Sequence, residues 1–164
     1  MALNAYLRIK SQELGEIKGS VTQKGREGMI LVTGASHSIE APRDAASGLP
    51  TGVRVHEPFV ITKELDRATP LLYNMLVRRD DIVEWELQFW QPSATGEEKN
   101  HYTVKLTNAT VTSIDFRMPD HQDPNFAQRA EYEEIAFTYQ KIQWIWDDGG
   151  ISASDDWEIG RAHV

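Results

Sequence analysis

Apolar and polar side chains alternate with a period of two through most of this chain, and this pattern restricts the fold to one built from β-strands. The clearest strand is IVEWELQFW, in which one face carries Val83, Trp85, Leu87 and Phe89. After the turn sequence PSATGEE, residues 102–106 repeat the alternation. The two segments therefore predict an antiparallel hairpin.

The last long strand contains a change of phase. Apolar residues occupy odd positions from Ile135 to Tyr139 and even positions from Ile142 to Trp146. Because successive side chains of a strand point to opposite faces, the apolar face cannot change without an extra residue. The pattern predicts a β-bulge near Gln140–Lys141.

One segment, TPLLYNMLVRR, has helical character. Thr69 is a suitable N-cap, and Pro70 follows at the first helical position. Leu72, Met75 and Leu76 form an apolar stripe with the spacing of a helix face. Many strands with one helix predict a mainly β fold, in which a helix lies across a closed or sandwiched antiparallel sheet.

Composition limits the partners and the compartment. A chain of 164 residues is expected to form one domain, residues 1–164. Its formal net charge of −8 makes a nucleic acid an unfavourable partner. No window has the length and apolarity of a membrane span, and the first residues do not have the pattern of a secretory signal. A soluble protein made in the cytoplasm is expected.

Residues with catalytic or metal-binding chemistry do not form a recognisable motif. The five histidines show no HxH or HxxxH spacing, so His37 and His56 are expected at a strand or loop surface and His121 in a solvated turn. Three acidic pairs are expected to be solvated turn residues: Asp80–Asp81, Asp147–Asp148 and Asp155–Asp156. The chain is expected to have no catalytic residue and no metal site.

The segment SIEAPRDAASGLPTGVRVHEPFVIT, residues 38–62, has no obvious place in such a fold. Its first half contains Pro42, Gly48 and Pro50 and has no apolar periodicity. A connection of this length in a compact domain is usually functional. A sheet-rich domain also has strand edges to protect. Both features predict subunits that pack side by side, and a head-to-tail contact of this kind can close into a ring.

Four stretches of the sequence closely resemble the haemolysin-coregulated protein (Hcp) family of type VI secretion. They are KGSVTQKGREGMI, LPTGVRVHEPFVITKELDRATPLLYNML, AFTYQKIQWIWDDGG and the late DDW. The resemblance extends over essentially the whole chain, but residues 33–35, Thr-Gly-Ala, stand near a place where the family has an aromatic residue. It implies a two-sheet antiparallel β-barrel with one flanking α-helix and a long extended loop, without enzymatic activity or cofactor.

The resemblance also implies a structural role. Hcp proteins form hexameric rings that stack into the inner tube of a contractile machine, and some carry small effectors in the channel. The implied partners are further copies of the chain, the spike protein and the sheath of the machine, with neither nucleic acid nor membrane insertion. The protein would be made in the bacterial cytoplasm and secreted without a signal peptide, to the extracellular space or a target cell.

Residue roles follow from the same resemblance. Contacts between subunits are expected from the loop residues Ser38, Glu40, Pro42, Arg43, Leu49, Pro50, Thr51, Arg54 and His56. Contacts between stacked rings are expected from Gln23, Lys24, Arg26 and Glu27. The channel lining is expected to include Ser113, Asp115 and Arg117.

Two other functions are compatible with the strand pattern. A tail-tube protein of a phage or phage-like contractile particle would have the same architecture in a different context. A small-molecule-binding barrel or an unrecognised hydrolase would instead require a buried pocket with converging polar groups.

Overall fold

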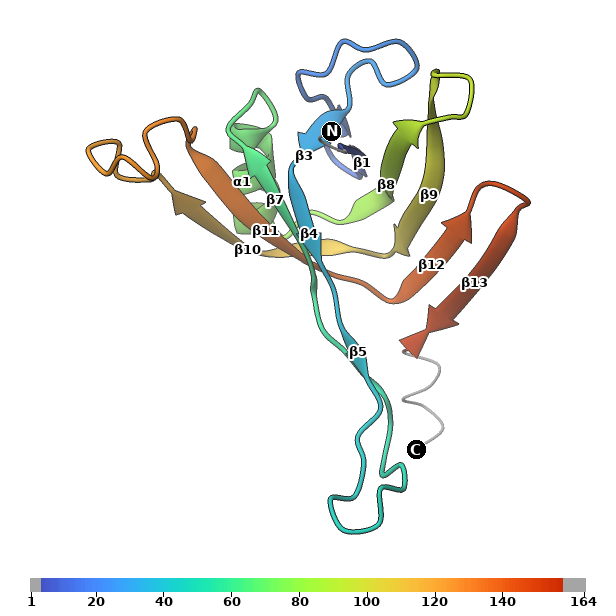
Figure 1. Cartoon of the computed structure of the whole chain (residues 1–164). Helices are drawn as coiled ribbons and strands as arrows, with labels where there is room; N and C mark the ends of the chain where they lie inside the picture. The colour runs from blue at the N-terminus through green and yellow to red at the C-terminus, as the bar shows by residue number, and fades with distance from the viewer. Residues whose placement is uncertain (1–3, 158–164) are drawn as a thin grey trace.

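The computed structural model describes residues 4–157, and this part of the chain consists mainly of β-strands with one helix (Figure 1). The strands are β1 (Ala5–Ser11), β2 (Gly15–Ile17), β3 (Ile30–Val32), β4 (Gly34–Ser36), β5 (Ile39–Glu40), β6 (Val55–His56), β7 (Phe59–Glu64), β8 (Ile82–Pro92), β9 (Glu98–Thr107), β10 (Thr110–Arg117), β11 (Tyr132–Thr138), β12 (Lys141–Trp146) and β13 (Ile151–Asp156). The helix α1 spans Thr69–Arg78.

The strands pair in two main sheets and a short ribbon. A seven-stranded sheet has the order β13-β12-β9-β8-β1-β2, with β3 also paired to β1. A four-stranded sheet has the order β10-β11-β7-β4, and β5 pairs with β6 alone. The expected fold class, mainly β with two antiparallel sheets, one helix and a long extended loop, is confirmed. The hydrogen-bonded ladders do not close into a complete barrel, because each sheet ends in edge strands.

The hairpin predicted from IVEWELQFW is β8 and β9, in which Leu87 lies opposite Val104. Val83 differs from its prediction, since its side chain is 58% exposed and Ile82 is buried instead. The ladder between β1 and β8 changes register near this point, which reverses the facing of the strand. The remaining apolar positions of the strand face the core as expected.

The phase change in the last long strand has a different cause from the predicted bulge. The chain leaves the four-stranded sheet at Thr138 and enters the seven-stranded sheet at Lys141. Phe137 and Ile142, which belong to opposite phases, are both buried in the same core. The bulge prediction is therefore wrong, because the change of face marks a crossing between two sheets rather than an extra residue in one ladder.

The core lies between the two sheets, with Trp85 at its centre. The Trp85 ring meets the rings of Phe59 and Phe137 edge to face, at centroid distances of 5.1 and 5.5 Å. Leu72 and Met75, from the predicted stripe of α1, are buried in the same cluster. Full burial of such side chains contributes about 1.5–3 kcal/mol each, so this cluster is the main source of stability.

A buried ion pair fixes the start of α1 against β7 and β11. The ammonium group of Lys63 lies 2.8 Å from Glu133 Oε1, 2.9 Å from Asp66 Oδ1 and 3.1 Å from Thr69 Oγ1, so each of its three protons has an acceptor. The Thr69 hydroxyl is thus committed to this network. For this reason the N-cap of α1 is Ala68, without a side-chain cap, and the prediction of Thr69 as N-cap is wrong.

Candidate functional site

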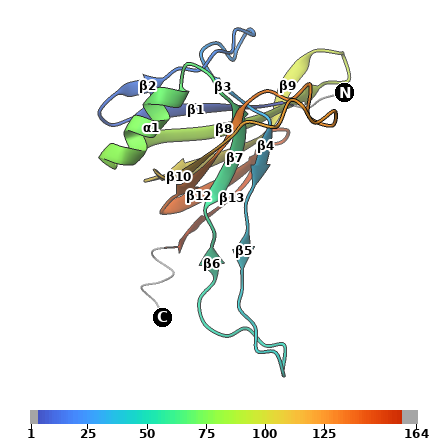
Figure 2. The same cartoon turned by 90° about the vertical axis from the view of Figure 1, so that its left-hand side faces the viewer.

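The loop noted in the sequence is an ordered ribbon. Residues 37–58 project from the body as two antiparallel segments (Figures 1 and 2). Strands β5 and β6 pair at its base, and an isolated bridge joins Arg43 to Pro50 farther out. We call residues 37–58 the arm and residues 42–51 its tip. The arm is the most prominent departure from a compact shape.

The tip is folded by its own hydrogen bonds. The Asp44 carboxylate accepts hydrogen bonds from the Ala46 amide at 3.1 Å and the Ser47 hydroxyl at 2.8 Å. The Ser47 hydrogen bond is the main reason why the pKa of Asp44 lies below its ordinary value. Gly48 has a φ of 72°, which only glycine adopts without cost. Beside it, Leu49 is 65% exposed.

Most residues predicted to contact another subunit are available for contact. Those that are exposed are Ser38, Glu40, Arg43, Leu49, Pro50 and Thr51. Pro42 is half-buried. The other two, Arg54 and His56, face the body of their own chain. The arm therefore divides into an outer part that offers side chains and an inner part that is attached.

His56 joins the arm to the body. Its side chain is only 1% exposed. The Nδ1 atom lies 2.7 Å from the Tyr139 hydroxyl, and the Nε2 atom lies 2.7 Å from Asp155 Oδ2. The imidazole also stacks on the indole of Trp157, at a centroid distance of 5.9 Å. The prediction of a surface position for His56 is wrong.

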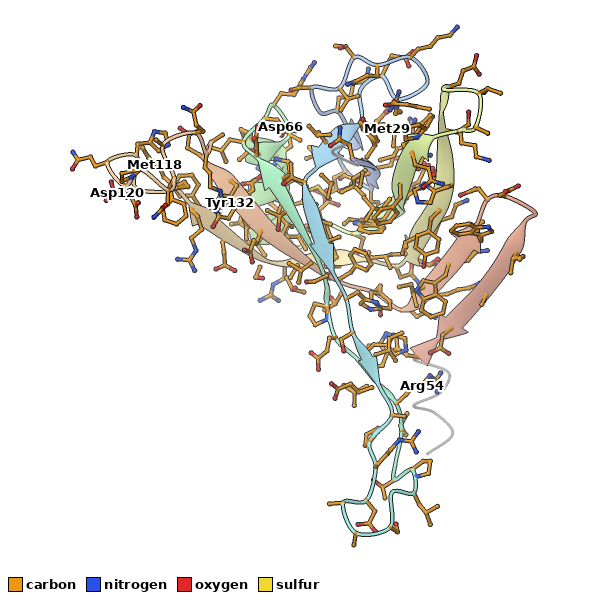
Figure 3. All side chains as sticks on the ribbon, in the orientation of Figure 1. Met29, Arg54, Asp66, Met118, Asp120 and Tyr132 are labelled. Carbon is orange, nitrogen blue, oxygen red and sulfur yellow. The ribbon has the colours of Figure 1, made fainter. Side chains whose placement is uncertain are left out.

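Arg54 makes a second attachment, beside the end of β13 (Figure 3). Its guanidinium donates two hydrogen bonds to the Asp155 carboxylate, at 2.5 and 2.6 Å. These hydrogen bonds, followed by the one from His56, hold the pKa of Asp155 below its ordinary value. Asp155 is thus a structural anchor, and the prediction that it is a solvated turn residue is wrong.

His37 approaches the same phenol from the other strand of the arm. Its Nε2 atom lies 2.7 Å from the Tyr139 hydroxyl, and its ring stacks on Phe59 at 5.1 Å. Burial, and then the charge of His56, lower the pKa of His37. Burial, and then the charge of Asp155, raise the pKa of Tyr139. We call His37, Arg54, His56, Tyr139 and Asp155 the arm root.

The turn predicted to contact a stacked ring has one buried and several exposed side chains. The Arg26 guanidinium lies 4.2 Å from the ring centroid of Trp90 and 4.8 Å from that of Tyr6, and it pairs with Glu98 at 2.8 Å. Such cation–π contacts hold the turn against the sheet. The exposed residues are Gln23, Lys24 and Glu27. Contact through these three stays a prediction, whereas Arg26, 6% exposed, positions the turn.

The residues predicted to line a channel are exposed on β10, the edge of the four-stranded sheet. Asp115 lies opposite Glu134, and Arg117 lies opposite Tyr132, which Figure 3 labels. Ile114, between Ser113 and Asp115 in sequence, packs against the core. The face of β10 that points away from the core is therefore polar at Ser113, Asp115 and Arg117. Its position in a channel stays a prediction.

Neither a cluster that could hold a metal ion nor a membrane-spanning helix is found between residues 4 and 157. Between residues 4 and 157, no three histidine, aspartate or glutamate side chains gather in a way that could hold a metal ion. No helix in this part of the chain is long and apolar enough to cross a membrane. Residues 33–35 border a surface cavity of about 150 Å³ together with Phe89 and Trp90.

The chain matches a known protein family over most of its length. The profile of the family described as "Type VI secretion system effector, Hcp" matches residues 6–146. The chain belongs to the Hcp family. Hcp proteins are known as ring-forming structural proteins of type VI secretion and are not known as enzymes.

Individual relatives agree over nearly the whole length. The chain is 39% identical to the "Major exported protein" of Pseudomonas aeruginosa, over 96% of each chain. A crystal structure of an Hcp protein has a TM-score of 0.88 at 30% identity and covers 95% of this chain and 98% of its own. The secreted protein Hcp3 of P. aeruginosa has a TM-score of 0.78 at 31% identity, over 95% of this chain and 99% of its own.

The arm root of this Hcp protein includes residues that the sequence did not single out. Tyr139 and Asp155 are 83 and 99 residues from His56. One signal was available: His37 and His56 lie at the two ends of the unusual loop. An antiparallel ribbon necessarily brings such ends together, so their convergence could have been predicted. The third member, Tyr139, could not.

Proposed function

We propose that this chain is a subunit of the type VI secretion inner tube. Copies would form hexameric rings, the rings would stack into a tube, and contraction of the machine would export them. The observation that carries the proposal is the arm, which is rigidly attached at its root and presents an exposed tip. Family membership supports the same role.

The tip has the properties of a contact element. It is shaped by bonds within residues 42–51, so binding to a partner would require little further ordering. It also carries Leu49, an apolar side chain far from its own core, which would gain from burial against another molecule. We infer that the tip docks on an adjacent copy, in the same ring or the next.

Strand edges support side-by-side packing. Within residues 4–157, the outer sides of β4, β10 and β13 pair with no other strand. Exposed edges favour association with further strands, and native proteins normally cover them. Neighbouring copies in a ring would cover these edges through a heterologous contact that closes by rotation.

The other predicted surfaces have distinct parts in this proposal. The polar face with Ser113, Asp115 and Arg117 would line the channel, where small effectors could be carried. The turn with Gln23, Lys24 and Glu27 would meet the next ring. The spike protein and the sheath would contact the ends and the outside of the tube. The protein would be made in the bacterial cytoplasm and released to the medium or a target cell.

Light scattering after size exclusion, together with negative-stain images, tests the proposal. Wild-type protein should give annular particles with the mass of a hexamer. Leu49→Asp at the tip should shift the protein toward a folded monomer, because a carboxylate would be desolvated at the contact. Val77→Asp, at a position of α1 that is 75% exposed, is the matched control and should leave the rings intact.

Two results would contradict the proposal. One is a wild-type protein that stays monomeric at high micromolar concentration, since weak rings dissociate on dilution but should persist there. The other is a deletion of residues 44–48 that unfolds the monomer, because the tip would then belong to the core. A phage tail tube would give the same particles, and the type VI family match favours the secretion role.

A further inference from the structure

The two strands of the arm meet on a single hydroxyl group. His37 stands where the chain enters the arm and His56 where it leaves, and each places a ring nitrogen 2.7 Å from the Tyr139 oxygen. Tyr139 itself lies between β11 and β12, where the chain crosses between the sheets. One phenol therefore links both strands of the arm to both sheets of the body.

The neutral histidines satisfy every hydrogen bond in this group. The ionised Asp155 can only accept, so His56 donates to it from Nε2. The Nδ1 atom of neutral His56 then accepts the phenolic proton of Tyr139. The Tyr139 oxygen in turn accepts the Nε2 proton of His37. Each donor has one acceptor, and the chain of bonds runs in one direction.

A second positive ring breaks this arrangement. One imidazolium can be accommodated, because the phenol donates to whichever ring stays neutral. When both rings are protonated, both nitrogens that face Tyr139 carry hydrogens, and the phenolic proton loses its acceptor. Two cations then adjoin one uncharged oxygen.

We propose that His37 and His56 form an acid-sensitive latch, which holds the arm to the body through Tyr139 while at least one ring is neutral and loosens the arm when both are protonated.

The charged groups around the two histidines do not offset the positive charge that the second proton adds. Arg54 already occupies Asp155 with two hydrogen bonds, and it also reaches the Asp156 carbonyl at 3.3 Å. Asp156 adds a further carboxylate on β13, which interacts with Arg54 and accepts a hydrogen bond from Gln140. Glu57 borders a cavity of about 20 Å³ beside His56, enough space for about one water.

The direction of the pH effect follows from the burial of His37. The pKa of His37 is lowered in the docked arm, whereas a released imidazole titrates at about 6.5. The released arm therefore binds more protons than the docked arm, and acid favours release. The latch is intact above about pH 6.5 and weakens as the pH falls below that value.

Amide hydrogen exchange of the monomer tests the latch without relying on ring formation. The Glu57 amide, which donates to the Ser38 carbonyl at 3.0 Å, and the β5–β6 pairs report on the arm root. From about pH 7.5 to about pH 5, their protection factors should fall several-fold. Amides of the β8–β9 ladder should keep theirs.

Variants separate the latch from general acid sensitivity. His37→Gln offers an amide N–H to Tyr139 that does not titrate, so protection at about pH 5 should stay near its neutral value. Tyr139→Phe removes the shared hydroxyl, so the arm root should be loose at both pH values. His121→Gln, on a distant exposed loop, is the control and should behave like wild type.

Specific results would overturn the latch. Arm-root protection that is unchanged between the two pH values would do so, as would equal losses at the arm root and in the β8–β9 ladder. An acid response that persists in His37→Gln would also exclude it. The consequence for rings, dissociation in acid, rests on the proposed tube function. If the wild type forms no rings but its arm root still loosens in acid, the tube proposal fails and the latch stands.

Discussion

The root and the tip of the arm use polar side chains in opposite ways. At the root, Arg54 and His56 are turned onto the body and bonded to Asp155, about 100 residues away in sequence. At the tip, Asp44 and Ser47 bond to residues within three positions. Long-range bonds fix the direction in which the arm projects, whereas local bonds give the tip a shape independent of the body. A contact element needs both properties, and the arm provides them in separate places.

Among these polar contacts, the buried ion pair in the body should have the largest effect on the free energy of unfolding. Glu133→Ala would remove the carboxylate that pairs with the Lys63 ammonium. The positive charge of Lys63, which is 0% exposed, would then be buried without that partner. Breaking a pair of this kind costs about 3–5 kcal/mol. We expect a loss of that size in the free energy of unfolding, measured by urea denaturation. Glu134→Ala, next to it on the exposed face, should change stability by less than about 0.5 kcal/mol.

The arm root should give an intermediate effect. Asp155→Ala removes the acceptor of both Arg54 and His56, and hydrogen bonds to charged groups contribute about 1.5–3 kcal/mol. We expect urea denaturation to show a loss of about 2 kcal/mol, with Asp148→Ala as an exposed control. A loss no larger than that of the control would mean that the root is not a true attachment.

Acid should produce a smaller change that also arises at the root. The native protein holds the pKa of His37 below its ordinary value, so the unfolded chain binds more protons as the pH falls. The free energy of unfolding should therefore decrease as the pH falls from about 7 to about 5. The lowered pKa of Asp155 should cause a further loss below about pH 4. An identical slope in His37→Gln would contradict the assignment of the first phase.

The tip should give the smallest effect on stability. Ser47→Ala removes the 2.8 Å hydrogen bond to Asp44 at an exposed site. The free energy of unfolding should change by less than about 0.5 kcal/mol, by the same urea assay. A loss comparable to that of Asp155→Ala would show that the tip is coupled to the core, and the contrast between tip and root would disappear.

Local patterns predicted the elements well, and the resemblance predicted the family. The alternation around Leu87 identified the β8–β9 hairpin, and the apolar stripe of Leu72 and Met75 identified α1. Periodicity describes which face a residue occupies within one ladder. It could not distinguish a bulge from the crossing at Tyr139 and Gln140, because both reverse the face.

The candidate site was harder to predict because it depends on distant parts of the chain. The unusual composition of residues 38–62 marked the arm correctly as a projecting segment. The surface position predicted for His56 was wrong, since its partners come from the sheet crossing and from β13. No sequence pattern relates these segments. The arm, the sheet crossing and β13 come together only when the whole chain has folded.

The arm is continuous with two strands of the four-stranded sheet, and this has a mechanical consequence. The chain runs from β4 into β5 and from β6 into β7, so a pull on the tip acts along β4 and β7 (Figures 1 and 2). Because β4 and β7 are pulled the same way, the resisting rungs are those between β7 and β11, which lie across that direction. Tension would load these rungs together in shear instead of peeling them apart singly, which would suit the proposed role as a tube subunit that contraction propels.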